Sequence, residues 1–155
     1  MKKVLLFVAI AVFVALNSCS KSSSTNEDND IIGTWEMTEM TTVPQTTAIS
    51  SETLTGSNLP FTQLIKLKAN GTYVKTRLTK TGEKIEIQGT YSDRWLEGER
   101  YISLLYSDEL DNPLSESCFG SGESLIYNTG KLINNFWPAC DGSYTLKYKK
   151  RIVID

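Results

Sequence analysis

The feature that most constrains the fold is the spacing of apolar residues from Ile31 onward, which is that of β-strands. β-branched and aromatic residues are common, and glycine, asparagine and proline interrupt them at short intervals. No segment keeps a helical apolar period over about twelve positions. In the segment 84–92, Ile85, Ile87 and Tyr91 alternate with polar residues, as in a strand with one buried and one solvated face. The sequence therefore predicts an all-β domain.

Turn residues divide this region into eight predicted strands, which are 31–41, 61–68, 72–79, 84–92, 100–107, 123–128, 131–137 and 143–154. Asn70-Gly71 predicts a hairpin turn. A two-residue turn there pairs Leu67 with Val74, whereas a three-residue turn pairs it with Tyr73. Consecutive strands with short links predict an antiparallel up-and-down meander, and closure into an eight-stranded barrel removes its exposed edges. An open sandwich is the alternative.

The first residues predict export and lipid attachment. Two lysines precede the apolar run 4–16, whose length as a helix is about 20 Å and too short to span a bilayer. That length suits a signal peptide. Leu16-Asn17-Ser18-Cys19 resembles the lipobox of bacterial lipoproteins, in which the cysteine receives diacylglycerol. We expect 1–18 to be the signal peptide and Cys19 to be lipidated; the alternative is an ordinary signal peptide with a chance cysteine.

The stretch after Cys19 contains no apolar residue as far as Asp30, so 19–30 is expected to be the lipidated cysteine and a flexible tether. Its acidic cluster at 27–30 resembles surface-export signals of Bacteroidetes lipoproteins, with a solvated spacer as the alternative. The expected location is the cell envelope, as an outer membrane lipoprotein on either face. The remainder, 31–155, is one domain's worth of chain.

Composition narrows the chemistry. The formal charge is −2 and lysines are scattered, so nucleic-acid binding is not expected. The chain has no histidine, which excludes Ser-His and Cys-His nucleophile pairs. The carboxylate pairs Glu97 with Glu99 and Asp108 with Glu109 are expected to be solvated loop charges. We therefore expect no enzyme activity, no cofactor and no metal site.

Three short motifs carry a family resemblance. Gly33-Thr34-Trp35 resembles the Gly-x-Trp signature of lipocalins, the segment 67–73 is similar to a hairpin of lipocalin-like domains in Bacteroidetes lipoproteins, and 89–92 resembles their next strand. The resemblance implies a lipocalin-like barrel whose closed end is plugged by Trp35. It also implies a cation stacked on that ring, supplied by Arg151 or a neighbouring lysine.

Two cysteines remain after Cys19. Cys118 and Cys140 are expected to form a disulfide, since an exported domain with one cysteine pair usually does. They face each other if Thr129 is the centre of the turn between the sixth and seventh predicted strands. A metal site or a catalytic thiol is the alternative.

The expected function is that of a binding module for a small apolar or amphipathic ligand. Tyrosines offer an apolar face and a polar tip, and five are candidates for the barrel interior, namely Tyr73, Tyr91, Tyr106, Tyr144 and Tyr148. The segment 42–60 is the candidate flap, with a surface loop as the alternative. A protein-interaction or inhibitor role is a second possibility, because Ser121-Gly122 near Tyr127 resembles the Ser-Gly loop of membrane-bound lysozyme inhibitors. A subunit of an envelope assembly is the third.

Overall fold

A computed structural model of the chain describes residues 30–42, 50–107, 114, 122–135 and 144–152. Its contacts separate Met1–Asp30 from a compact unit, Ile31–Asp155. Of the first unit only Asp30 is described, so the predicted signal peptide and Cys19 lie outside the described residues.

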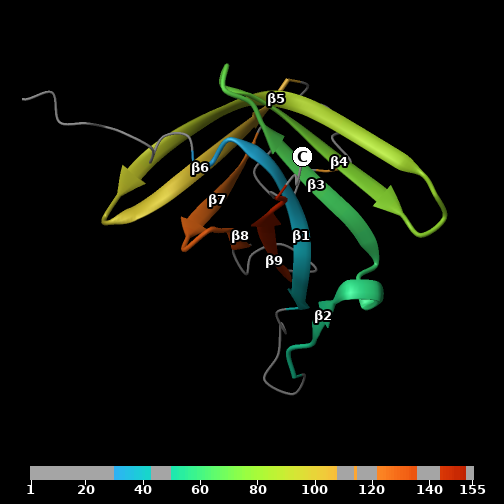
Figure 1. Cartoon of the computed structure of the whole chain (residues 1–155). Helices are drawn as coiled ribbons and strands as arrows, with labels where there is room; N and C mark the ends of the chain where they lie inside the picture. Colours follow the sequence, from blue (N-terminus) through green and yellow to red (C-terminus); the bar gives the residue numbers. More distant parts are fainter. Residues whose placement is uncertain (1–29, 43–49, 108–113, 115–121, 136–143, 153–155) are drawn as a thin grey trace, which may run out of the picture. The chain divides into compact units, whose positions relative to one another are not determined.

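The described part of this unit is a closed antiparallel barrel with one added strand (Figure 1). Strands β1 and β3 to β9 follow each other around the wall in chain order, and β9 pairs with β1 to close it. The short β2 pairs only with the C-terminal half of β1, from Glu39 to Thr41. The predicted up-and-down barrel of eight strands is confirmed, and the open sandwich is wrong. The elements are β1 Gly33–Thr42, β2 Thr53–Thr55, the 3-10 helix η1 Gly56–Asn58, β3 Phe61–Leu67, β4 Thr72–Thr79, β5 Lys84–Leu96, β6 Glu99–Tyr106, β7 Gly122–Asn128, β8 Lys131–Asn135 and β9 Tyr144–Lys150.

The predicted strand at 72–79 is reproduced, the other predicted strands have shifted ends, and the largest shifts are in β5 and β9. β5 continues to Leu96, four residues beyond its predicted end. It remains paired with β6 along this extension, and the last pair is Leu96 with Glu99. The polar residues after Tyr91 concealed this extension. At the other end of the chain, β9 stops at Lys150 rather than at residue 154. β2 and η1 were not predicted at all.

The hairpin at Asn70-Gly71 resolves an alternative that the sequence left open. Leu67 pairs with Tyr73, and the Gly71 amide donates to the Lys68 carbonyl over 3.1 Å. Gly71 has φ +78°, so this is a three-residue turn that ends in the left-handed region. The register directs Tyr73 and Lys75 into the barrel.

The turn between β7 and β8 differs from expectation by one residue. Asn128 pairs with Lys131, and Thr129 (φ 48°) and Gly130 (φ 74°) form a two-residue turn. The predicted register, centred on Thr129, is therefore wrong. It no longer supports the pairing of Cys118 with Cys140, which themselves lie outside the described residues.

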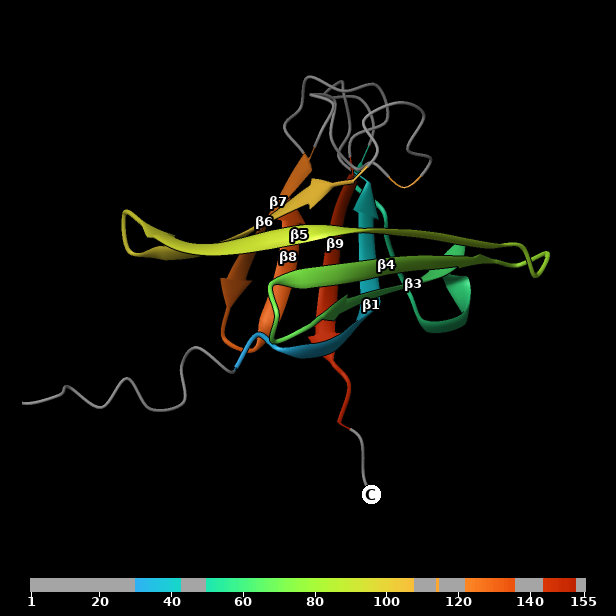
Figure 2. The same cartoon turned by 90° about the horizontal axis from the view of Figure 1, so that it is seen from above.

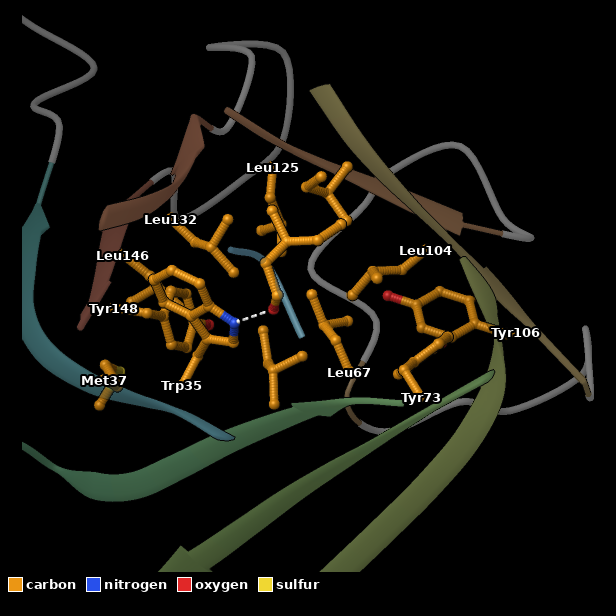
Figure 3. Close-up of a cluster of buried hydrophobic side chains, with 13 residues drawn as sticks. Trp35, Met37, Leu67, Tyr73, Leu104, Tyr106, Leu125, Leu132, Leu146 and Tyr148 are labelled. Atoms are coloured by element: carbon orange, nitrogen blue, oxygen red, sulfur yellow. Dashed lines mark hydrogen bonds between the residues drawn. The ribbon is translucent and has the colours of Figure 1, made fainter. Parts of the chain in front are cut away.

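The barrel interior holds one apolar cluster, shown in part in Figure 3. Close packing of the wall depends on two glycines beside β6. A Cβ at Gly89 would lie 1.9 Å from the Leu105 carbonyl oxygen, and one at Gly122 would lie 2.4 Å from that of Leu104. Neighbouring strands therefore approach the end of β6 from both sides only because these positions lack a side chain. The buried residues of the cluster are Ile31, Trp35, Met37, Ile65, Leu67, Tyr73, Ile102, Leu104, Tyr106, Leu125, Leu132, Leu146 and Tyr148.

One seam of the wall is split. β1 pairs with β3 only from Gly33 to Glu36 and then, after a register shift between Met37 and Glu39 in its pairing with β9, pairs with β2 instead. The first residues of β3, from Phe61 to Gln63, pair with β4 alone among the described strands. Figure 2 shows η1 beside the diverging ends of β1 and β3.

Candidate functional site

Trp35, the predicted plug, is completely buried near the start of β1. Its indole nitrogen donates to the Ile31 carbonyl over 2.7 Å, as drawn in Figure 3, and its ring meets Tyr127 edge to face at 6.1 Å. Lys150 supplies the nearby cation, with Nζ 5.9 Å from the ring centre. Arg151 instead pairs with Glu36, Nε to Oε2, over 2.9 Å. Of the two candidates from the sequence, the lysine is the one beside the indole.

The barrel interior contains a buried polar cluster that the sequence did not predict. Lys75 on β4 and Glu123 on β7 form an ion pair of 2.8 Å, with side-chain exposures of 0% and 1%. The Lys75 ammonium also donates to the Leu114 carbonyl over 2.9 Å, and the Asn134 amide donates to the second Glu123 oxygen over 3.0 Å. A buried pair of this kind is tolerated because hydrogen bonds satisfy both charges.

A second polar chain leads from this cluster's neighbourhood toward the split seam. The Gln63 amide donates to the Tyr148 hydroxyl over 2.7 Å, and Arg77 Nε donates to the Gln63 carbonyl oxygen over 2.8 Å. The Arg77 guanidinium lies 3.9 Å from the centre of the Phe61 ring, within the range of a cation–π contact. The polar chain therefore ends on Phe61, at the first residue of β3.

A groove of about 530 Å³ occupies the split seam. Its apolar lining comes from Met37, Leu59, Phe61 and Leu78, and its polar lining includes Thr62, Thr79 and both charged residues Glu36 and Lys80. The volume lies within the range of about 300–1,000 Å³ found for small-molecule sites. The groove combines an apolar surface with a polar rim, which suits an amphipathic molecule.

The two charges on the groove are not equivalent. Glu36 is paired with Arg151, as described above. Lys80 is exposed and makes no ion pair with the described residues. Among the described residues, Lys80 is therefore a positive charge on the groove that has no ion-pair partner.

The five candidate tyrosines all contact the interior, but in two ways. Tyr73, Tyr106 and Tyr148 belong to the buried cluster, and Tyr91 and Tyr144 are partly buried against it. Burial, and secondarily the charge of Glu123, raises the pKa of Tyr73 well above its usual value. None of the five lines the groove as the structure describes it, so their role in binding stays a prediction.

The segment 42–60, the candidate flap, is only partly described. Its described part forms β2 and η1, and η1 with Leu59 contributes one wall of the groove. The unpredicted helix η1 thus supplies a wall of the site. The segment has no Asn-Gly pair such as the one at 70–71, and Gly56, which has φ 55°, is its local cue for a turn at η1.

Other types of site find no support in the described part of the chain. No group of three or more potential metal ligands is present among these residues. A search of the same residues finds no helix with the length and apolar character needed to cross a membrane. Glu97 lies in the tip of the β5–β6 hairpin and Glu99 begins β6, where its carboxylate accepts a hydrogen bond from Tyr101. Asp108 and Glu109 lie outside the described residues.

Comparisons with known proteins add little to this description. No protein-family profile matches the sequence, and no curated protein matches it. Among solved structures, the fold is similar to a lipocalin-like protein from Bacteroides uniformis, with 15% identity and a TM-score of 0.48, over 79% of this chain and 99% of that one. The barrel assignment rests on the strand pairings themselves.

Proposed function

We propose that this protein is a membrane-anchored, lipocalin-like binding module that takes a small amphipathic molecule with an anionic head into the groove between β1 and β3. The observation that carries the proposal is the groove itself, an opening of about 530 Å³ in a barrel wall that is otherwise continuous. Binding sites of this size are commonly mostly apolar with a few polar groups.

The lining supports both parts of the ligand. Met37 is almost fully buried and Phe61 is fixed by the overlying Arg77, so the apolar surface is preformed. Preformed surfaces reduce the entropy lost on binding. Lys80 at the rim attracts a carboxylate or phosphate, because no described acidic residue neutralises it.

The anchor belongs to the same proposal and is supported by the sequence motif at Cys19. Two or more acyl chains hold a protein firmly at a bilayer, and the lipoprotein modification would supply that number.

We also propose that binding, rather than catalysis, is the activity of the domain, since the chain has no histidine. Intact-mass measurement of the native protein tests the anchor, which requires loss of residues 1–18 and a lipid mass on Cys19.

Calorimetric titration with dodecanoate tests the groove, with dodecyltrimethylammonium as a probe of opposite charge. We expect the anion to bind at least tenfold more tightly than the cation. The substitution Thr62→Trp places a large ring on the groove and should weaken dodecanoate binding at least tenfold. Its matched control is Lys66→Trp, which changes an exposed residue of the same strand outside the groove lining.

The charge preference has its own test. Lys80→Glu should reverse the preference between the two probes, whereas Lys131→Glu, an exposed lysine on β8, should leave it unchanged. If folded protein binds neither probe, or if Thr62→Trp and Lys66→Trp bind equally well, the groove is not the ligand site.

A further inference from the structure

The β5–β6 hairpin carries an exposed apolar tip at the other end of the barrel from the groove. We call residues 93–100 the hairpin tip. Trp95 is 64% exposed and Leu96 is 52% exposed, although such large apolar side chains are usually buried. Adjacent exposed Trp and Leu at a tight turn require an explanation that the groove does not supply.

The hairpin extends beyond the strand that precedes it in the wall. Pairing of β4 with β5 ends where Thr72 meets Thr90, and the Tyr91 amide then donates to the Gly71 carbonyl. The residues from Ser92 to Leu96 continue paired with β6 only. At roughly 3.3 Å per residue, this extension is about 17 Å long. Figure 2 shows the hairpin reaching well past the neighbouring strands.

The tip is held in place by its own contacts. Arg100 is 4% exposed and pairs with Asp93, Nη2 to Oδ2, over 2.6 Å. Its guanidinium carbon lies 6.0 Å from the Trp95 ring and 5.4 Å from the Tyr127 ring. Trp95 is therefore exposed on a hairpin whose base is held by these contacts.

The start of the barrel unit lies at the same end as the hairpin. The Ile31 carbonyl accepts the Trp35 hydrogen bond, the Trp35 ring contacts Tyr127, and Tyr127 contacts Arg100 at the base of the tip. Figures 1 and 2 both show the first residues of β1 on the side to which the hairpin points. Ile31, the first residue of the barrel unit, thus lies at the end of the barrel that carries the hairpin.

We propose that the hairpin tip inserts Trp95 and Leu96 into the interface of the lipid bilayer that holds the Cys19 anchor, an inference that rests on the proposed anchoring. The tether 20–30 has a root-mean-square length of about 18 Å if it is flexible. This reach is comparable to the length of the hairpin extension. Indole rings favour the boundary between lipid headgroups and acyl chains.

The charges of the tip define the kind of surface that it fits. The charges of Asp93 and Arg100 neutralise each other in their ion pair. The remaining charged residues of the tip are one cation, Arg94, and two anions, Glu97 and Glu99. The tip is slightly acidic, so contact is driven by apolar burial and not by attraction to anionic lipids. Zwitterionic phospholipids are sufficient, and added salt should not release the tip.

Fluorescence of the lipidated mature protein in phosphatidylcholine vesicles tests the inference. Trp137→Phe leaves Trp35, which is fully buried, and Trp95 as emitters. Lipids brominated near the top of the acyl chain should quench the emission of Trp95 at least twofold, at low and at high salt. Trp95→Phe should abolish this quenching. The control variant adds Leu105→Trp to Trp95→Phe, which moves the indole to a residue that is 51% exposed near the other end of β6. We expect the brominated lipids not to quench an indole at that position.

The outcomes separate the tip from the anchor. Vesicle flotation with strong quenching of Trp95 alone supports the inference. Flotation without quenching of Trp95, or with equal quenching of an indole at position 105, overturns the inference and leaves the anchor intact. If the protein carries no lipid on Cys19 and does not float, the proposed anchoring is wrong, and the inference about the hairpin tip, which rests on it, is overturned as well. Binding of dodecanoate by the groove is tested independently of this outcome.

Discussion

Removing one partner of the ion pair between Lys75 and Glu123 should destabilise the barrel strongly. Both side chains are buried, so Lys75→Met leaves a carboxylate, and Glu123→Gln leaves an ammonium, without its opposite charge. Breaking a buried pair in this way typically costs about 3–5 kcal/mol. For the 125 residues from Ile31 to Asp155, the unfolding entropy is about 260 cal/mol/K, so each kcal/mol corresponds to about 4 °C. We expect a fall in melting temperature of about 12–20 °C for each single variant.

Urea unfolding followed by circular dichroism measures these losses. The double variant Lys75→Met/Glu123→Gln should be more stable than the sum of the single effects predicts, by at least about 2 kcal/mol, because no charge is left uncompensated. Its glutamine still accepts from Asn134, as Glu123 does. The coupling isolates the pair from a general loss of packing.

A matched pair on the surface provides the control. Lys84 and Glu86 also lie 2.8 Å apart, but their side chains are 62% and 50% exposed. Solvent screens such a pair, so Lys84→Met should change stability by no more than about 0.5 kcal/mol. If each buried single variant loses less than about 1 kcal/mol, the reasoning from burial is refuted.

The remaining predictions concern side chains elsewhere in the barrel. Because burial raises the pKa of Tyr73, ionisation of this residue in the unfolded chain begins near pH 10 and stability falls as the pH rises further; Tyr73→Phe should reduce that loss in alkaline urea titrations. The same variant should change stability at pH 7 by less than about 1 kcal/mol, since the buried hydroxyl has no hydrogen-bond partner among the described residues. Thr129→Asn should raise the melting temperature by about 4 °C, because a β-branched residue there adopts φ 48°. Trp35→Ala should lose about 3–5 kcal/mol of stability in urea. When the purified protein is denatured without reductant, Cys118 and Cys140 should resist alkylation, and free thiols would contradict the predicted disulfide.

The strand positions were largely predictable from the sequence, because alternation and turn residues are local signals. The face of a strand that turns inward was harder to predict. In β4 the inward face carries Tyr73, Lys75 and Arg77, whereas Val74 is only partly buried and Leu78 is exposed. Hydrophobicity alone favours the wrong face.

The partner that makes this arrangement acceptable is distant in sequence. Lys75 is stabilised by Glu123, 48 residues away, and no local pattern indicates that pairing. Asn70-Gly71 was a partial signal, since a three-residue turn there fixes the inward direction of Tyr73, but the sequence left the length of the turn open. The groove was also unpredictable, because it arises where β1 leaves β3 and where η1, a single helical turn with few sequence signals, supplies a wall.

The two glycines beside β6 link the wall of the barrel to its charged centre. A methyl group at Gly89 or Gly122 would meet a carbonyl oxygen of Leu105 or Leu104, which forces the strands apart. Gly122 directly precedes Glu123, so spreading the wall there moves the carboxylate away from Lys75. Gly122→Ala should therefore weaken the coupling between the two charges as well as the barrel itself. The absence of a side chain at Gly122 thus bears both on the packing of the wall and on the position of the buried carboxylate of Glu123.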